Sequence, residues 1–551
     1  MKSRSISPGT YLLLAVLLIL VTAPLVWVLA VSVTGYGSDP SAIGSIFSAQ
    51  TGKVLGNTVL LSVLVVLFAT LMAAPLAYLS SWTQFRHSSA IDLLVMVPFM
   101  TPPFVSSLAW MDLVRPRGPV WQVFGKGFQG GLHNFIFSIW GMAFIMASEI
   151  FTLLYLILRT AMSNVPASTM EMAEVAGASR WQRARQIVIP QLVGPYSLGA
   201  LIVFIRAAGE FGTPVTLGNA IGFQVLVSSV HQDVTVDPLN FSHAAAGSTV
   251  LFALGVTVWG IQQWISRIDT DQGGRASRRY AVSLKAPGKT AGWAWVTIIA
   301  LLSVIIPLVS IVLGAMTILR SKPPTANNLS FDYFSIALSN PAAQEALRTS
   351  AVLGLLAATL SVILAIWVTI TLMRGKSWLS RLIDFVAVSP DTIPAIVLAI
   401  GFILLWNSSW LPWTPYGTKG ILIMAYAAIF LPTTVQNVKA SAAGVSSSLI
   451  EAATVSGASR WQLLTRIVVP MLAPGIIAGW LLAFLVGIRE LVMSSLVRPA
   501  NLNLLAPFIM NQFEQGHRNE AMVMTLIGVV SSTIVLVAVT AWQRRRQAQE
   551  A

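Results

Sequence analysis

The stretch EMAEVAGASRWQRARQIVIP, residues 171–190, returns 280 positions later as EAATVSGASRWQLLTRIVVP, residues 451–470. In both copies a glycine, Gly177 or Gly457, follows a run of helix-forming residues and precedes Ser-Arg-Trp-Gln. Glycine is the residue that most readily takes the left-handed conformation with which many helices end. Each copy is therefore predicted to form two short helices joined by a glycine turn.

Serine residues predict where these helices begin. A serine followed three residues later by Glu or Gln forms a capping box, in which the two side chains bond to each other's backbone N–H groups. The four predicted boxes are Ser168 with Glu171, Ser179 with Gln182, Ser448 with Glu451, and Ser459 with Gln462. The second helix of each copy is expected to run toward a proline, Pro190 or Pro470.

The repeat extends beyond these copies. Residues 86–105 align with 376–397 at a shift of 292, which exceeds the other shift by 12 residues. The extra residues of the first half are expected near 110–131, a stretch rich in Gly and Trp. The duplication predicts two domains and a linker: residues 1–266, a linker at 267–290, and residues 291–551.

The composition indicates a membrane protein. Of the 551 residues, 55% are hydrophobic and only 10% are charged, whereas soluble domains carry about 25% charged residues. The net charge is +14, from 34 Lys and Arg against 20 Asp and Glu. In so apolar a chain this excess indicates membrane topology rather than nucleic-acid binding. The absence of cysteine excludes disulfides, zinc–thiolate sites and cysteine nucleophiles.

Apolar stretches long enough to cross a bilayer predict an all-α membrane protein with about twelve transmembrane helices. They lie near 11–32, 57–82, 90–112, 135–158, 192–212, 245–266, 293–318, 349–373, 384–408, 419–438, 472–492 and 519–542. Six spans per half make the halves parallel, related by a pseudo-two-fold axis along the membrane normal. Most Lys and Arg residues fall on the side that holds both termini, which is therefore predicted to be cytoplasmic.

On this topology the two repeated loops face the cytoplasm. An Arg-Trp pair stands just past each glycine, and Arg and Trp are enriched at the energetic centres of protein interfaces. A docking site for a protein is the favoured interpretation. An amphipathic hairpin lying on the lipid headgroups is the alternative.

The loops resemble the EAA loop of ABC-importer permeases, which reads E-A-A, three residues, G, and then I-x-L-P about nine residues later. Met172 replaces one Ala of the motif in the first copy, and a β-branched residue replaces the Leu in both. The resemblance implies a fused permease of the type I importer fold, whose loops dock two copies of a cytoplasmic ABC ATPase. The residues it assigns to docking are Glu171, Ala173, Gly177, Ser179, Arg180, Trp181, Pro190, Glu451, Ala453, Gly457, Ser459, Arg460, Trp461 and Pro470.

The segments 211–218 and 489–509 are similar to ferric-iron permeases that work with a periplasmic binding protein. Permeases for thiamine, phosphonates or phosphorylated sugars share much of this pattern and remain alternatives. The resemblance further implies a bacterial inner-membrane location, and a binding protein docking on the external loops 213–244 and 319–348. Histidines are few and lie in loops, so a metal site on this chain is not expected.

Ionisable residues at span depth usually face a polar path or a partner. The candidates for a translocation path or gate are Glu149, Arg206, Glu210, Asp391, Arg489 and Glu490. Arg206 and Glu210 are four residues apart and can pair on one helix face. Glu210 and Glu490 are repeat equivalents that could face each other across the axis. The acidic excess suits a cationic cargo, whereas structural ion pairing is the alternative.

No complete phosphate-binding loop of the form GxxxxGK[ST] occurs in the chain. Ser283 and Ile370 stand where the first glycine would be required in the two partial matches. We therefore expect no catalytic site or cofactor on this chain, with ATP and Mg²⁺ bound by the partner ATPase. An ion-coupled secondary transporter also fits twelve spans in parallel halves, but its elaborate cytoplasmic loops would follow the second and eighth spans.

Overall fold

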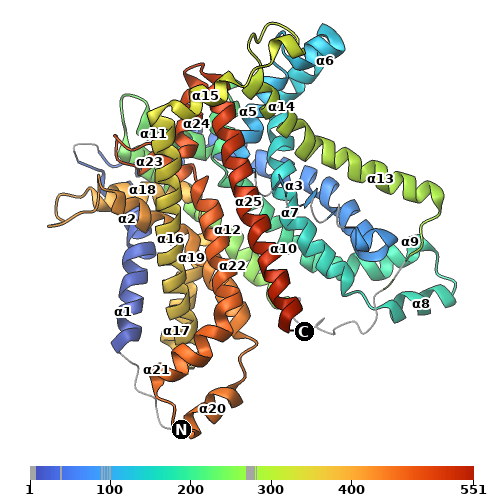
Figure 1. The fold of residues 1–551 in the computed structure, drawn as a ribbon. Coiled ribbons are helices and arrows are strands. Elements are labelled where there is room, and N and C mark those ends of the chain that lie inside the picture. The colour runs from blue at the N-terminus through green and yellow to red at the C-terminus, as the bar shows by residue number, and fades with distance from the viewer. Residues whose placement is uncertain are drawn as a thin grey trace. The chain divides into compact units, whose positions relative to one another are not determined.

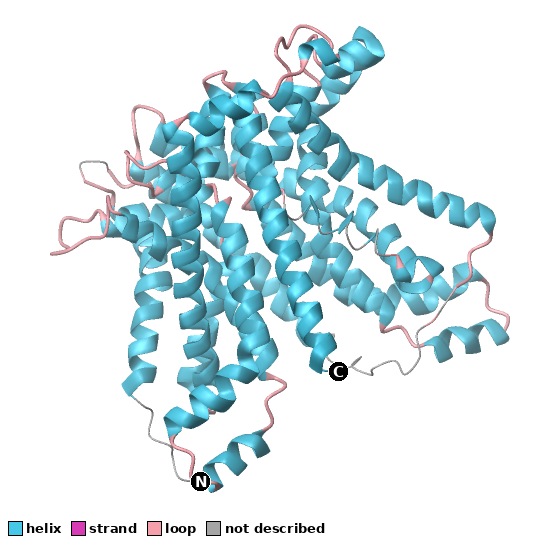
Figure 2. Cartoon of the chain, in the orientation of Figure 1, coloured by secondary structure: helices cyan, strands magenta, loops and turns pink. Residues whose placement is uncertain are grey.

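The computed structural model describes residues 8–37, 40–88, 91, 94–95, 97–98, 101–268, 280, 282–375 and 377–550. The described part is built from helices and loops, with an isolated bridge between Thr317 and Leu329 and no strand (Figures 1 and 2). The predicted all-α class is confirmed. Of the linker 267–290, residues 269–279 and 281 lie outside the described part.

Nine helices of the described part are long and apolar enough to cross a membrane. They are α1–η1–α2 (Pro8–Thr34), α3 (Ala49–Trp82), α7 (Ile139–Ser163), α9–η4–α10 (Arg180–Ala208), α12 (Phe241–Ile268), α13–η7–α14 (Ala286–Met316), α16 (Pro341–Met373), α19 (Lys419–Ala442) and α21–η10–α22 (Trp461–Ile488). Other helices are α5 (Pro103–Leu113), α6 (Pro119–Ile136), α8 (Ala167–Val175), α11 (Leu226–Thr235), α15 (Asp332–Ser339), α17 (Trp378–Val388), α18 (Ala395–Trp406), α20 (Ser447–Val455), α23 (Val492–Leu496), α24 (Leu505–Glu514) and α25 (Arg518–Glu550).

The ninth predicted span, 384–408, is not a straight helix. It consists of α17, a short 3₁₀ turn η9 (Ser389–Thr392) and α18, and the two α-helices are bent by 111°. Pro394 causes the break because the residue before a proline avoids helical angles. Ile393 accordingly has φ −110° and ψ 126°. In the third span, 90–112, the helix α5 likewise begins after the equivalent proline, Pro102, which has ψ 139°.

The chain forms two compact units, which we describe separately. The first unit comprises Met1–Ile46, Asp233–Thr249 and Ser335–Ala551, and the second comprises Phe47–Gln232 and Val250–Phe334. These units differ from the sequence halves, because each takes its first span from the other half. The linker at 267–290 as a boundary of the duplication stays a prediction.

Close packing explains how the exchanged spans are held. In the first unit α2 packs on α18, where a Cβ on Gly401 would lie 2.5 Å from the carbonyl oxygen of Pro24. In the second unit α14 packs on α5, and the Ser310 hydroxyl donates to the carbonyl of Ala109 at 2.7 Å. Both contacts join backbones so closely that only a small side chain fits.

Each unit has a core of three spans that the repeat relates. These are α3, α7 and α10 in the second unit and α16, α19 and α22 in the first. A Cβ on Gly199 would lie 2.8 Å from Leu154 Cδ1, and one on the equivalent Gly479 would lie 3.1 Å from Thr434 Cα. Because Leu154 and Thr434 are also equivalent, the duplication is preserved in the packing as well as in the sequence.

Candidate functional site

Each repeated loop folds into two short helices joined by a glycine turn, as predicted. We call them the first hairpin (α8 and α9, Arg180–Arg183) and the second hairpin (α20 and α21, Arg460–Leu463). Gly177 has φ +77° and Gly457 has φ +81°. These are left-handed values that a side chain rarely adopts.

The turn closes through the two hydrogen bonds of a Schellman motif. In the first hairpin the N–H of Gly177 donates to the Glu174 carbonyl at 3.0 Å. The next N–H, of Ala178, donates to the Ala173 carbonyl at 2.9 Å. The second hairpin repeats both bonds at 3.1 and 3.0 Å. Ala173 and its equivalent Ala453 therefore contribute through their backbone carbonyls.

Capping boxes occur at the second helix of each hairpin and not at the first. The Ser179 N–H donates to Gln182 Oε1 at 2.7 Å, and the Gln182 N–H donates to Ser179 Oγ at 3.2 Å. Ser459 and Gln462 make the same pair at 2.9 and 3.2 Å.

The boxes predicted at the starts of α8 and α20 are wrong. Pro166 stands at the N-cap of α8 with φ −66°, which starts the helix at Ala167 and moves Ser168 into its first turn. In the second hairpin the N-cap is Ser446, so Ser448 is likewise already helical. A serine inside the first turn cannot cap the helix that contains it.

The second helix of each hairpin runs toward its proline, as predicted, and continues past it. A π-turn, η4 (Ala184–Val188) or η10 (Leu464–Val468), carries the chain through Pro190 or Pro470 into α10 or α22. Proline lacks an N–H and its ring clashes with the carbonyl four residues earlier, and a π-turn widens the helix at that point. Each hairpin is thereby one end of a continuous membrane helix.

Large apolar side chains are exposed at matching positions of both hairpins. Val175 and Val455 are 90% and 88% exposed, and Trp181 and Trp461 are 69% and 71% exposed. Exposed apolar clusters of this kind mark interaction sites. Arg180 is exposed as well, whereas the side chain of Arg460 lies outside the described part.

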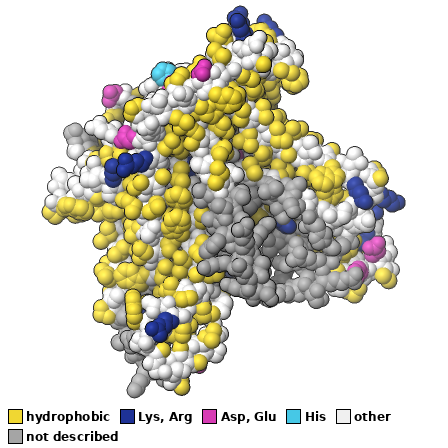
Figure 3. Space-filling model, viewed as in Figure 1, with side chains coloured by type: hydrophobic (Ala, Val, Ile, Leu, Met, Phe, Trp, Pro, Cys, Tyr) yellow, Lys and Arg dark blue, Asp and Glu magenta, His cyan; other side chains and the backbone are white. Residues whose placement is uncertain are grey.

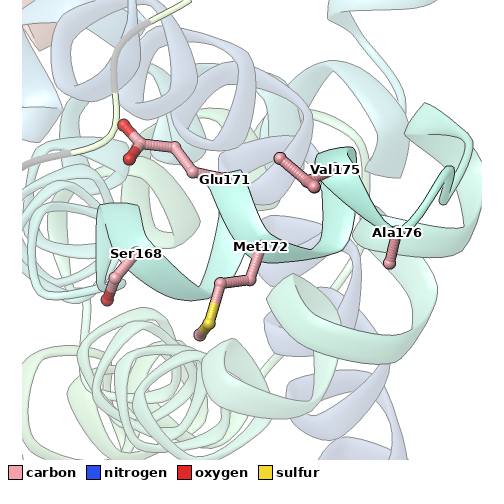
Figure 4. Close-up of a pocket in the computed structure, with 5 residues that line it drawn as sticks. All are labelled: Ser168, Glu171, Met172, Val175 and Ala176. Atoms are coloured by element: carbon pink, nitrogen blue, oxygen red, sulfur yellow. The ribbon is translucent and has the colours of Figure 1, made fainter.

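An open hollow of about 420 Å³ lies along α8. It is lined by Ser168, Glu171, Met172, Val175 and Ala176, and Figure 4 shows Met172 and Ser168 on one side of the helix and Glu171 on the other. The hollow is bordered mainly by apolar side chains and one carboxylate. It extends the exposed apolar surface of the first hairpin.

The first hairpin is braced by a contact that sequence reasoning missed. Arg183, which is buried, pairs with Glu174 at 2.6 Å and donates to the Tyr280 hydroxyl at 3.2 Å. Tyr280 in turn packs edge-on against Trp82. The repeat equivalents of Arg183 and Glu174 are Leu463 and Thr454, which cannot form an ion pair. Opposite charges on either side of a glycine turn were the signal that could have revealed the brace.

Two of the charged path candidates bond to the backbone just after their spans. The Glu210 carboxylate accepts from the N–H groups of Gly212 and Thr213 at 2.8 and 3.0 Å. The Glu490 carboxylate accepts from Val492, Met493 and Ser494 at 2.9 to 3.1 Å. Each caps the short helical segment that follows, η5 (Pro214–Gly218) or α23. Helix N-termini favour such anionic caps.

The six path candidates are divided equally between the two units. Glu149, buried in α7, and Arg206, exposed on α10, belong to the second unit with Glu210. In the first unit, Asp391 lies half-buried in η9 at the 111° break, and Arg489 lies half-buried at the end of α22 beside Glu490. Their role in a path therefore stays a prediction.

Comparison with known proteins places this arrangement in a family. The family model described as "Binding-protein-dependent transport system inner membrane component" matches residues 65–268 and again residues 352–549. Each matched segment begins inside the first helix of a three-span core, α3 or α16, and includes the rest of that core and its hairpin. The segments then extend to the end of α12 and into α25.

Relatives share much of the chain at low identity. A putative ferric transport system permease from Haemophilus influenzae is 24% identical, over 78% of this chain and 68% of its own. A ferric transport system permease from Actinobacillus pleuropneumoniae is 23% identical, over 88% of this chain and 70% of its own. A spermidine/putrescine permease from Escherichia coli is 26% identical, over 37% of this chain and 76% of its own. The chain therefore belongs to the inner membrane components of binding-protein-dependent transport systems, and it carries their domain twice.

Proposed function

We propose that this chain is the membrane-spanning permease of an ATP-driven importer that carries ferric iron inward. The observation that supports it most strongly is the pair of equivalent hairpins, each with an exposed Val and Trp and each continuous with a membrane helix. Two equivalent surfaces fit two copies of one cytoplasmic ABC ATPase. A secondary transporter would have no use for two such docking surfaces.

The hairpins transmit movement because they are rigid extensions of membrane helices. The helix Arg180–Ala208 has 29 residues and, at 1.5 Å per residue, spans about 43 Å. A displacement of Trp181 at one end moves the segment capped by Glu210 at the other. ATP-driven closure of the two ATPases draws the hairpins together, and the halves rock to open outward. Hydrolysis resets them inward.

The predicted membrane topology indicates on which side of the membrane each remaining partner binds. The hairpin side carries most of the 34 Lys and Arg residues, which puts the hairpins and both termini in the cytoplasm. The substrate-binding protein then docks on the opposite face. ATP and Mg²⁺ belong to the partner ATPase, because the phosphate-binding loop that hydrolysis requires is missing from this sequence.

Ferric iron is the favoured cargo because two relatives that cover most of the chain are named as ferric permeases. Thiamine, phosphonates and phosphorylated sugars remain the alternatives. Asp391 at the break of the ninth span, together with Glu210 and Glu490, is our choice for the path or gate. Prolines and free carbonyls at membrane depth are tolerated where a cavity is lined.

Reconstitution tests the proposal. Proteoliposomes containing the chain, with its ATPase and binding protein, are expected to take up radiolabelled ferric iron only when ATP is supplied to the ATPase side. Uptake by the chain alone, driven by a proton gradient, would refute the importer. ATP-dependent uptake of thiamine or a phosphorylated sugar, and not of iron, would correct the cargo alone.

The docking assignment has its own test. Gly177→Pro combined with Gly457→Pro removes the left-handed turn from both hairpins, because proline fixes φ near −65°. This variant is expected to insert into membranes normally and to lose binding of the ATPase. Normal binding of the ATPase by the double variant contradicts the assignment.

A further inference from the structure

The helix α6 is a feature of the first half that the transport mechanism does not use. It occupies the stretch where the first half holds its extra residues, between α5 and α7. It is kinked at Gly125, which has φ +82°. The corresponding connection in the second half, from Trp406 to Lys419, holds no helix in the described part of the chain.

One face of α6 is packed against its own unit. Val120, Gln129 and Ile136 are buried, and the side-chain amide of Gln129 donates to the carbonyl of Val114 at 2.6 Å. Just before α6 begins, Arg115 and the more distant Arg320 both pair with the buried Asp112. The helix is thus held to the end of α5 through Gln129, and the ion pairs of Asp112 fix the segment that leads into it.

Beside these buried residues, α6 exposes large apolar side chains. Val123 and Phe124 are 67% and 64% exposed, Phe128 is 58% exposed, and Phe135 is 39% exposed. Phe124 and Phe128 lie against each other with ring centroids 5.2 Å apart. Phe128 and Phe135 are seven residues apart, two helical turns, so they share one side of the helix. An exposed aromatic stripe on a firmly held helix indicates a partner.

Charge and position identify that partner as lipid. No acidic residue occurs between Asp112 and Glu149, whereas Arg117 and Lys126 are exposed on or beside α6. Figure 3 shows basic side chains at the tip where Figure 1 places α6, next to hydrophobic surface. Apolar helices with basic flanks bind the surface of anionic membranes.

The short connection to α7 limits how far α6 can lie from the membrane surface. Only Phe137 and Ser138 separate α6 from α7, a membrane-crossing helix that begins at Ile139. Trp140, in the first turn of α7, is 50% exposed, and tryptophans at span ends lie at the headgroup level. Two residues of chain reach at most about 7 Å, so the end of α6 must lie close to that level.

We propose that α6 is a membrane-surface helix whose face of Phe124, Phe128 and Phe135 inserts among anionic phospholipids at the side of the membrane where α7 begins. Among the residues that the structure describes, the corresponding connection of the second half holds no such helix, so the proposed lipid contact of α6 belongs to the first half. The proposal requires a membrane around the chain but neither the ATPase nor a cargo.

The absence of cysteine makes a direct test possible, since any single cysteine can carry a spin label. Labels are placed at Phe128→Cys and Phe135→Cys, with Lys126→Cys and Asn134→Cys as matched exposed controls on other sides of the helix. The chain is assembled in nanodiscs of phosphatidylcholine with phosphatidylglycerol. Collision rates with oxygen, which partitions into lipid, and with a water-soluble nickel chelate are then compared.

The labels at 128 and 135 are expected to collide mainly with oxygen, at a depth of about 5–10 Å below the headgroups. The labels at 126 and 134 are expected to collide mainly with nickel. Equal nickel access at all four positions overturns the proposal. So does shielding of 128 and 135 that appears only when the binding protein is added, because a protein is then the partner.

A second measurement tests whether the positive charge of Lys126 contributes to the insertion of α6. In the protein with Lys126, phosphatidylglycerol is expected to deepen the insertion of the label at 128. In Lys126→Gln this deepening is expected to be smaller, because Arg117 then remains as the other exposed basic residue. Insertion that ignores the anionic lipid in both proteins refutes the electrostatic part. All four labelled variants keep the transport machinery, so a failed importer assay leaves this result intact.

Discussion

Replacing the hairpin glycines by alanine isolates the backbone contribution to docking. At Gly177 and Gly457 an added Cβ would meet no atom within 4 Å, so the substitution introduces no clash. The only penalty is the left-handed conformation at φ +77° and +81°, which costs a non-glycine residue about 1–2 kcal/mol. That energy corresponds to a population ratio of about 5 to 30.

The single variants Gly177→Ala and Gly457→Ala are each expected to weaken ATPase binding by up to that factor, and the double variant by up to the product. The reason is that the ATPase must bind a turn that is populated less often. Binding of the purified ATPase to the chain in nanodiscs is measured by surface plasmon resonance. Asparagine tolerates the left-handed region better than alanine, so the corresponding Asn variants are expected to fall between wild type and Ala.

Gly222→Ala is the matched control. Gly222 has φ +68° and equally open surroundings, but it lies in a different loop. It is expected to leave ATPase binding unchanged. The reasoning fails if Gly222→Ala weakens binding as much as Gly177→Ala. It also fails if the double Ala variant binds normally while Trp181→Ala with Trp461→Ala abolishes binding, because the turn geometry is then irrelevant.

Three further predictions concern the brace, the caps and the packing. Arg183→Leu gives the first hairpin the residue that the second hairpin has at that position. A spin label at Trp181→Cys is then expected to become more mobile, approaching the mobility of a label at Trp461→Cys. Unchanged mobility of the label argues against the brace. Glu490→Ala leaves three N–H groups without their cap and is expected to lower stability in thermal unfolding by about 1–2 kcal/mol. Glu490→Gln keeps an acceptor oxygen and is expected to keep most of that stability; a Gln variant as unstable as Ala would contradict the cap. Gly475→Ala places a Cβ 2.3 Å from the Asn437 carbonyl oxygen and is expected to destabilise the protein by about 1–3 kcal/mol in thermal unfolding. Gly260→Ala is the neutral control, because its Cβ meets no atom within 4 Å.

The hydrogen-bond partners of the charged residues could not be predicted fully from the sequence. Spacing along the sequence suggested that Glu210 can pair with Arg206 on one helix face, and this pairing stays a prediction. In the structure the helix ends at Ala208, and the Glu210 carboxylate accepts from the N–H groups of the next segment. The repeat correctly indicated that Glu490 would share the role of Glu210. It could not indicate the role itself, which depends on where each helix ends.

The structural effect of each proline also depends on its surroundings. Pro190 and Pro394 both interrupt the hydrogen bonding of an apolar helix. Before Pro190 the chain keeps helical angles through a π-turn and continues into α10, whereas before Pro394 it becomes extended and the helix bends by 111°. The missing N–H is a property of the residue. Whether a wider turn or a break accommodates it depends on the helices that pack around it.

The repeated stretch at 171–190 and 451–470 determined the hairpins by itself. Their turns and second capping boxes depend on contacts between residues three to five apart, and local contacts follow directly from local sequence. The exchange of first spans, the break at Pro394 and the brace on Arg183 were decided only by tertiary structure. Each of these depends on contacts between segments far apart in the chain, and apolar helices look alike in sequence whichever neighbour they choose.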